Sequence, residues 1–446
     1  MHRRGVLMLL VFALLAATCS SSDDEAGTDP PPSTTDAAVT TAAPSTAAVA
    51  PTSTTPALTA SFRGVTEEVI KVGVLSLDWQ ALADLGVNLG RGTSDDLYSA
   101  ALEAINDRGG IHGRMLELHP VTIFPVGTAE SEAACVELTQ DIEVFVVAGA
   151  MIGDSVLCYT EQHDTAVVVA ASRPDERIER AVAPYATING ATTDQARRFV
   201  EIMEERGLLE DATIGVVGAV DTDEDTYRAV FAAFEEAGYD PVPGLIGGNQ
   251  EDLVESANEQ AVIFERMEAE GVDVTVSTVG VPLGMANAID AGYETDQWLL
   301  YGLLSPFGLR DANVPLEYLD GAVGVGVSPV GTSVQPTLRD DPVIDACLTD
   351  LDERTGRTAV VDLDAPVNDL SSYLAACSFA AILEQGLLNA GPDLTNESFQ
   401  AGLEAIGEID LPGYRDAYLE PGHLGAADGF FVAVMDAEAG VWQLDE

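Results

Sequence analysis

The chain has 446 residues and carries 74 acidic but only 20 basic side chains, which gives a formal net charge of −54. A surface this negative repels nucleic acid and anionic lipid, so the composition argues against binding to either. We expect a solvated acidic surface suited to a salty habitat. A surface that excludes ligands of like charge is the alternative, although physiological salt screens such a field beyond ~8 Å.

The first residues have the pattern of an export signal. Basic residues at positions 3 and 4 precede an apolar run over 6–17, which is too short to be a permanent membrane span. The following LAATC at 15–19 resembles the lipobox of bacterial lipoproteins, in which the new N-terminal cysteine is acylated. Thr18 stands where that pattern has Gly, Ala or Ser, and Leu15 lies one position early. The sequence predicts a signal peptide over 1–18 and a lipid anchor at Cys19, with simple secretion as the alternative.

Residues 19–65 are mostly Ser, Thr, Ala, Pro and Asp with very few large apolar side chains. Such a segment buries too little surface to offset its ordering entropy, so we expect a disordered, lipid-anchored linker. The remaining chain, about 380 residues, is too long for one comfortable core and predicts two lobes. The expected location is the outer face of the cytoplasmic membrane, at the cell surface or in the periplasm.

Residues 69–121 predict a strand, a helix and a second strand. The apolar run IKVGVLSL at 70–77 has β-branched residues and no proline, as a strand buried on both faces does. A helix follows in SAALEAINDR, and Gly109 and Gly110 end it. Apolar and polar residues then alternate over 115–121, which is typical of a strand near a sheet edge. Together they indicate a βαβ unit of a parallel sheet.

The run AINDRGGIHGRMLEL at 104–118 belongs to this unit. A strand that ends in a short ligand loop, a helix that closes on two glycines and a G-R-x-(I/L/M)-E-L strand occur together in the type I periplasmic solute-binding proteins. From residue 69 onward the chain resembles that family, which comprises the branched-chain amino-acid and amide receptors of ABC importers. The resemblance implies an α/β clamshell of two Rossmann-like lobes, hinged by several crossover strands, and a monomer that hands a small solute to a permease.

Strand and helix continue to alternate along the chain. In lobe 1 we expect helix 130–141, strand 144–150, a helix capped by Asp154, and strand 166–172. After a crossing near 186–193, the expected strands of lobe 2 are 213–220, 272–280 and 297–304, and its helices are 227–237, 255–270 and 285–291. Strand 321–331 returns to lobe 1, and helices 342–355 and 370–390 complete it. The final segment, 429–445, predicts a hairpin, which in the family packs on lobe 2.

The predicted domain division follows from these elements. It assigns 66–189 to the first part of lobe 1, 190–327 to lobe 2, 328–415 to the second part of lobe 1, and 416–446 to the C-terminal hairpin on lobe 2.

Four cysteines follow Cys19, and an even number in an exported chain predicts disulfides. Of the three possible pairings we expect Cys135 with Cys158 and Cys347 with Cys377, because the members of each pair are close in sequence. Members of the family carry a bridge near the first pair. A nucleophilic Cys158 assisted by His163 is the disfavoured alternative, since residues five apart on one helix point to different faces.

The sequence shows no catalytic or metal-binding pattern. Its five histidines lack HExxH spacing, the cysteines lack C-x-x-C, and there is no G-x-S-x-G. The glycines of 321–331 are spaced like part of a phosphate loop, but no G-K-S/T follows them. We therefore expect no cofactor, no metal and no enzyme activity. An extracellular hydrolase is the weakest alternative, because it needs a nucleophile or a metal.

Ligands of open α/β sheets bind at the carboxyl ends of the strands. In the family, a Ser or Thr before x-Pro-Glu hydrogen-bonds the ligand, and Ser172 matches it unless it only caps the next turn. Trp79 suits an apolar or planar ligand, with a contact between the lobes as the alternative. The candidate ligand-binding residues lie at the ends of predicted strands or just after them: Leu77, Asp78, Trp79, Ile152, Gly153, Asp154, Ser172 and Arg173 in lobe 1, and Asp221, Thr222, Gly280, Leu303 and Ser305 in lobe 2.

Two departures from the family pattern limit the class of ligand that we expect. Amino-acid receptors of the family hold the ligand ammonium with a carboxylate after the strand that matches 297–304, where this chain has Leu303, Leu304 and Ser305. The aromatic residue of their first loop in lobe 2 is replaced by acidic 221–223. The predicted function is an exported lipoprotein that captures a small amino-acid-like, amide or carboxylate solute between the lobes and delivers it to an ABC importer permease. A ligand-sensing ectodomain of a signalling system is the alternative.

Overall fold

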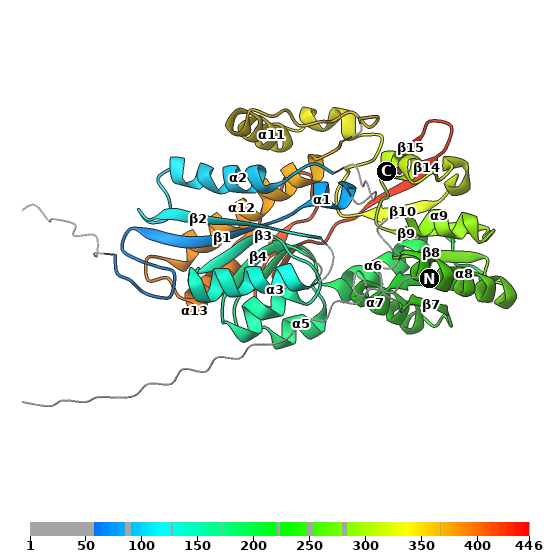
Figure 1. Ribbon diagram of the computed structural model, residues 1–446, viewed down its shortest axis with the longest axis horizontal. Helices are drawn as coiled ribbons and strands as arrows, with labels where there is room; N and C mark the ends of the chain where they lie inside the picture. Colours follow the sequence, from blue (N-terminus) through cyan, green and yellow to red (C-terminus); the bar gives the residue numbers. More distant parts are fainter. Residues whose placement is uncertain are drawn as a thin grey trace, which may run out of the picture. The chain divides into compact units, whose positions relative to one another are not determined.

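The computed structural model describes residues 58–84, 91–125, 128–171, 173–220, 224–247, 253–278, 283–365 and 367–445. These residues belong to one compact unit, Pro56–Glu446, which contains two large β-sheets (Figure 1). The predicted signal peptide, the anchor at Cys19 and most of the predicted linker lie outside the described residues. No helix in the described ranges is both long and apolar enough to cross a membrane.

The first sheet, with the helices packed on it, is lobe 1, and its six strands are all parallel. Its strand order is β13-β5-β4-β3-β1-β2. The central strands are apolar and buried, as expected for a parallel sheet covered on both faces. The strands are β1 (Val69–Leu77), β2 (Met115–Ile123), β3 (Val146–Ala150), β4 (Ala166–Ala170), β5 (Tyr185–Asn189) and β13 (Gly425–Ala427).

Two helices dominate the core of lobe 1. α12 (Leu370–Ala390) is apolar nearly all round and is buried among β3, β4, β5 and its helical neighbours. α2 (Asp95–Asp107) packs beside it over β1 and β2 (Figure 1). The other helical segments are α1 (Trp79–Asp84), α3 (Ala129–Val136), η1 (Glu137–Asp141), α4 (Ser155–Leu157), η2 (Cys158–Gln162), α5 (Asp175–Arg180), η4 (Gln335–Asp340), α11 (Pro342–Thr355) and α13 (Asn396–Glu404), with a small ladder of β11 (Gly407–Glu408) and β12 (Tyr418–Leu419).

The second sheet, with its helices, is lobe 2, and its order is β15-β14-β10-β9-β8-β6-β7. β14 and β15 are antiparallel additions to five parallel strands. One apolar cluster joins α6 and α7 to the sheet, and another joins it to the helices that follow β7. The strands are β6 (Ile214–Ala219), β7 (Val242–Ile246), β8 (Val274–Ser277), β9 (Gln297–Tyr301), β10 (Val323–Gly326), β14 (Phe431–Asp436) and β15 (Val441–Asp445); the helices are α6 (Thr192–Glu205), α7 (Glu224–Glu236), α8 (Leu253–Glu270), α9 (Leu283–Asp290), α10 (Pro306–Asp311) and η3 (Leu316–Leu319).

The chain passes between the two sheets three times: after β5, after β10 and after β13. The predicted α/β fold with two lobes and several crossovers is therefore confirmed. The hairpin predicted at 429–445 forms as β14 and β15 on the second sheet. Earlier in the range 416–446, however, β13 hydrogen-bonds to β5 of the first sheet, so this part of the predicted hairpin segment lies on lobe 1.

Arg114, from the G-R-x-(I/L/M)-E-L motif, has a structural task. Only 1% of the residue is exposed. Its guanidinium donates to three backbone carbonyls: Thr66 at 2.7 Å, Pro392 at 2.8 Å and Thr59 at 3.0 Å. These carbonyls lie before β1 and before α13, so one side chain joins the start of the folded unit to a late loop of lobe 1.

Both predicted disulfides are present, Cys135–Cys158 and Cys347–Cys377. The second joins α11 to α12 and encloses 30 residues of sequence separation. Replacing both Cys347 and Cys377 with serine should lower the free energy of unfolding by about 3 to 4 kcal/mol, because the open chain gains entropy when unfolded. Urea denaturation would measure this loss. Equal stability of the oxidised wild type and the double variant would contradict it.

Candidate functional site

The loop after β1 contains three predicted ligand-binding residues. Leu77 is 9% exposed and belongs to the lobe 1 core. Asp78 Oδ1 accepts a hydrogen bond from the Ala81 amide at 2.9 Å, so this carboxylate caps α1. Trp79 is half-buried, and the Arg91 guanidinium lies 4.7 Å from its ring centroid. Of the three, Trp79 is the side chain that offers partly accessible aromatic surface, with a cation stacked on it.

The loop after β3 departs from the prediction at Asp154. This residue occupies the N-cap position of α4, but its carboxylate makes no capping hydrogen bond. Instead, Asp154 Oδ1 accepts from Arg177 Nε at 2.8 Å, so the predicted capping role is wrong. The loop is closed by the Ser155 hydroxyl, which donates to the Ile152 carbonyl at 2.6 Å. Gly153 lies between them with φ of 51°, in the left-handed region that glycine adopts without strain.

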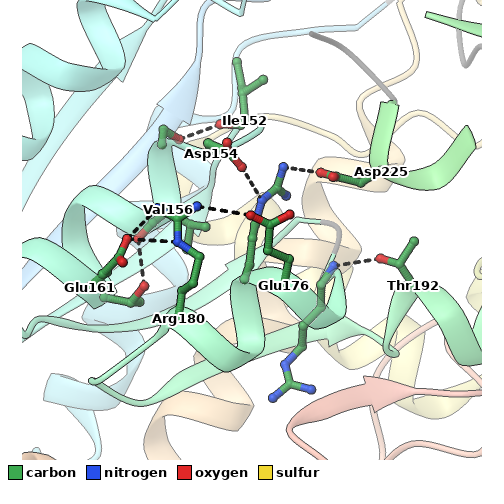
Figure 2. Close-up of polar contacts among 12 residues, drawn as sticks. Ile152, Asp154, Val156, Glu161, Glu176, Arg180, Thr192 and Asp225 are labelled. Atoms are coloured by element: carbon green, nitrogen blue, oxygen red, sulfur yellow. Dashed lines mark hydrogen bonds and ion pairs between the residues drawn. The ribbon is translucent and has the colours of Figure 1, made fainter. Parts of the chain in front are cut away.

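Arg177 makes ion pairs with carboxylates of both lobes. It is the one buried residue of α5, with a side chain only 6% exposed. Besides Asp154 of lobe 1, it donates to Asp225 near the start of α7 in lobe 2. Figure 2 shows Asp154 and Asp225 on either side of this contact. The arginine therefore forms an ionic bridge between a loop at the carboxyl end of β3 and a helix of the other sheet.

Burial controls the ionisation of the groups around Arg177. Burial raises the pKa of Asp225, while the Arg177 charge acts in the opposite direction. Burial also raises the pKa of Tyr185 to about 12, against the charge and hydrogen bond of Arg177. Tyr185 is therefore a neutral phenol at ordinary pH. The Arg177 charge therefore offsets part of the desolvation of the half-buried Asp225 carboxylate.

Arg173, after β4, is buried but turns away from the other candidates. Its backbone amide donates to the Thr192 hydroxyl at 3.1 Å, which ties the end of β4 to the first crossover. Its Nε donates to the Tyr185 carbonyl at 3.3 Å, and its guanidinium lies 5.6 Å from that ring. The side chain lines a cavity of about 530 Å³ beside α13, and none of the other candidates that the structure describes lines this cavity.

The lobe 2 candidates after β9 have local structural roles. Ser305 Oγ accepts from the Gly308 amide at 3.4 Å and caps α10. The Leu303 side chain packs over β10, where a Cβ on Gly324 would lie 2.7 Å from it. The intervening Leu304 carbonyl accepts from Trp442 Nε1 at 2.8 Å. Four further candidates, Ser172, Asp221, Thr222 and Gly280, lie outside the described residues.

Among the described candidates, only some lie where they could contact a ligand between the lobes. Trp79 and Asp154 follow strands of lobe 1, and Arg177 carries the contact from Asp154 to lobe 2. The sequence prediction did not include Arg177 or Asp225. No short-range signal identifies them, because the two lie 48 positions apart and their segments look like ordinary solvated acidic helices. The cysteine and histidine group at Cys135, Cys158 and His163 offers no thiolate, because both sulfurs are in a disulfide.

A family model described as periplasmic binding protein matches residues 70–439. No curated protein matches the chain significantly. Among solved structures, the chain is similar to a possible leucine/isoleucine/valine-binding protein from Rhodopirellula baltica SH 1, with 15% identity, a TM-score of 0.60, and coverage of 85% of this chain and 96% of that one.

Two further solved structures are similar at the same level. A fatty acid ABC transporter substrate-binding protein from Thermomonospora curvata has 16% identity and a TM-score of 0.61, over 86% of this chain and 93% of that one. A solute-binding protein of an ABC transporter from R. palustris, in complex with 4-hydroxybenzoate, has 16% identity and a TM-score of 0.58, over 85% and 96%. At these identities the likeness shows the fold alone. The fold and the family model agree, and the chain belongs to the periplasmic binding protein family, type I, of which solute-binding proteins of ABC transporters are members.

Proposed function

We propose that this protein is an extracytoplasmic solute-binding lipoprotein that captures a small organic ligand between its lobes and delivers it to an ABC importer permease. The observation that carries the proposal is the Arg177 bridge. It places a loop at the carboxyl end of a lobe 1 strand against a helix of lobe 2, on a scaffold whose sheets are joined by three crossovers. Two lobes joined by connecting segments can close around a solute, and the closed form presents a changed surface to a membrane partner.

The proposed ligand is a small carboxylate, an amide or an amino-acid-like solute. Among the similar solved structures, one is a complex with leucine, one is a fatty acid ABC transporter substrate-binding protein, and one is a complex with 4-hydroxybenzoate. The fold therefore accommodates several kinds of carboxylate. After β9 this chain has Leu303, Leu304 and Ser305, which offer no carboxylate for an ammonium group. That departure favours a ligand without an α-ammonium.

Attachment and organisation complete the proposal. Cys19 would carry the lipid, residues 19–65 would form the tether, and the folded part would act as a monomer. The proposed divisions of the folded part are 66–189 and 328–415 for lobe 1, 190–327 for lobe 2, and the C-terminal segment from 416. Mass spectrometry of the protein isolated from its native membrane would show whether the chain begins at an acylated Cys19 or at an unmodified one.

Ligand capture is tested by native mass spectrometry of the purified protein, followed by a thermal-shift panel of small carboxylates and amides. A bound solute should raise the free energy of unfolding by about 2.7 kcal/mol when its concentration is a hundred times its dissociation constant.

Once a ligand is found, Trp79→Ala and Ser172→Ala should each weaken its binding about tenfold without unfolding the protein. Gln80→Ala is the matched control, since Gln80 is exposed beside Trp79 and its side chain hydrogen-bonds to Asp84 on the same short helix. Unchanged affinity in both variants by calorimetry would remove these residues from the site.

A further inference from the structure

Arg173 is a buried cation whose charge is not matched. The residue is 5% exposed. Its Nε donates to the Tyr185 carbonyl at 3.3 Å, and its guanidinium faces the same tyrosine ring, at 5.6 Å. Within the ranges that the structure describes, its two terminal nitrogens have no hydrogen-bond acceptor and no carboxylate lies at ion-pair distance. Neutral partners therefore supply all of its close contacts.

This isolation is unusual in a chain with 74 acidic and 20 basic side chains. Nearby arginines of the same region are paired: Arg177 with Asp154 and Asp225, and Arg180 with Glu161. Burial lowers the pKa of Arg173, with Tyr185 and the more distant Asp175 acting in the opposite direction. An uncompensated buried charge is costly, so a guanidinium kept here without a protein anion is suited to an anion from outside.

The cavity lined by Arg173 has a volume of about 530 Å³, which is enough for a small organic molecule. Its apolar side is made by Ile178, Ala181, Val182 and Leu424. On the α13 side it is lined by Asn396, whose Oδ1 is buried and has no hydrogen-bond donor among the described residues. The Arg173 guanidinium and the apolar wall are the features of this cavity that match a carboxylate with a hydrocarbon tail, whereas the Asn396 oxygen offers it no hydrogen bond.

We propose that this lobe 1 cavity binds a small organic monocarboxylate, held by Arg173, at a site separate from the ligand site between the lobes. The planar guanidinium matches the two oxygens of a carboxylate through parallel hydrogen bonds. The apolar wall suits a short hydrocarbon tail and offers nothing to an inorganic anion. Glu397 and Glu404 also line the cavity, and their charges disfavour a dianion such as phosphate. One negative charge on an apolar body is the chemistry that this cavity accommodates.

The test is a ligand-observed NMR titration of the purified protein with butyrate, with butyramide as the neutral isostere and inorganic phosphate as the dianion. Saturable butyrate binding is expected, with both comparison compounds at least tenfold weaker. Arg173→Gln should weaken butyrate at least tenfold. Ala181→Trp keeps the charge but fills the cavity from a half-buried position, and it should have the same effect.

Arg180→Gln is the matched control for the charge. Arg180 lies at the end of α5, which begins two residues after Arg173, and its replacement removes one positive charge, but Arg180 is exposed and does not line the cavity. Its butyrate affinity should equal that of the wild type. Butyrate bound between the lobes would keep its affinity in Arg173→Gln and Ala181→Trp alike, so this outcome would overturn the second site and leave the solute-binding function intact. The absence of butyrate binding, or equal binding of butyramide, would also overturn the second site.

Discussion

Arg114→Met is expected to lower the free energy of unfolding by about 3 kcal/mol, roughly 1 kcal/mol for each of the three hydrogen bonds that its guanidinium donates. Methionine preserves much of the buried stem, so the loss measures the polar contacts rather than packing. Lysine at this position retains the charge but not the planar guanidinium with its several N–H donors, so Arg114→Lys should recover only part of the lost stability. Urea denaturation of the wild type and both variants provides the comparison.

Arg108→Gln is the matched control for Arg114. Arg108 lies six residues earlier on the same βαβ unit, but its side chain is 55% exposed and pairs with Glu384 at the surface. Its replacement should change the stability by no more than about 0.5 kcal/mol. If Arg114→Met is equally mild, the stability of this segment does not depend on the arginine, and the proposed structural task is wrong.

Arg177→Gln should weaken the contact between the lobes. It removes the cation that Asp154 and Asp225 share and leaves the partly buried Asp225 carboxylate without its partner. Because both carboxylates keep some contact with solvent, we expect the contact between the lobes to weaken by about 2 kcal/mol, less than the 3–5 kcal/mol of a fully buried pair. A distance distribution between spin labels on α5 and α7, measured without ligand, should shift to longer distances.

Two further variants serve as controls for Arg177→Gln. Arg180→Gln removes an arginine that pairs with Glu161 within lobe 1, so its distance distribution should match that of the wild type. The distance distribution of the double variant Arg177→Gln/Asp225→Asn should be closer to that of the wild type than the distribution of Arg177→Gln, because the partly buried carboxylate is removed and only the largely exposed Asp154 stays unpaired. A wild-type distribution in Arg177→Gln would show that the bridge does not hold the lobes together.

Local periodicity predicted most elements of the fold because their signals are strong. The apolar run that became β1 and the helices α11 and α12 occur where the sequence places them. β7 was not predicted, since Pro243 and Gly244 within it favour a turn. The strand is possible because β7 is the edge of its sheet, where a residue without an amide hydrogen leaves no ladder bond unmade. β5 was missed as well, because its short run after Pro184 resembles a connection.

The candidate site was harder to predict because its partners are distant in sequence. Asp154 is a residue type that often caps helices and it stands directly before one. Its carboxylate nevertheless accepts a hydrogen bond from a buried arginine 23 positions later. Arg173 was expected beside the ligand loops because it follows a strand, but a strand position does not fix the direction of a long side chain. Its guanidinium follows β5 to Tyr185 instead. Tertiary contacts of this kind are decided by packing between elements, which local patterns do not contain.

The return of the chain to the first sheet has a consequence for the order of folding. α12 covers β3, β4 and β5, and β13 completes the edge beside β5, so lobe 1 lacks its core helix until more than 390 residues have been synthesised. Contacts this far apart in sequence form slowly, because a long loop must close first. The nascent chain therefore stays without a stable native lobe 1 during most of its synthesis. For a protein that we propose to be exported, this delay keeps the chain in a state that can still be threaded through a translocation channel.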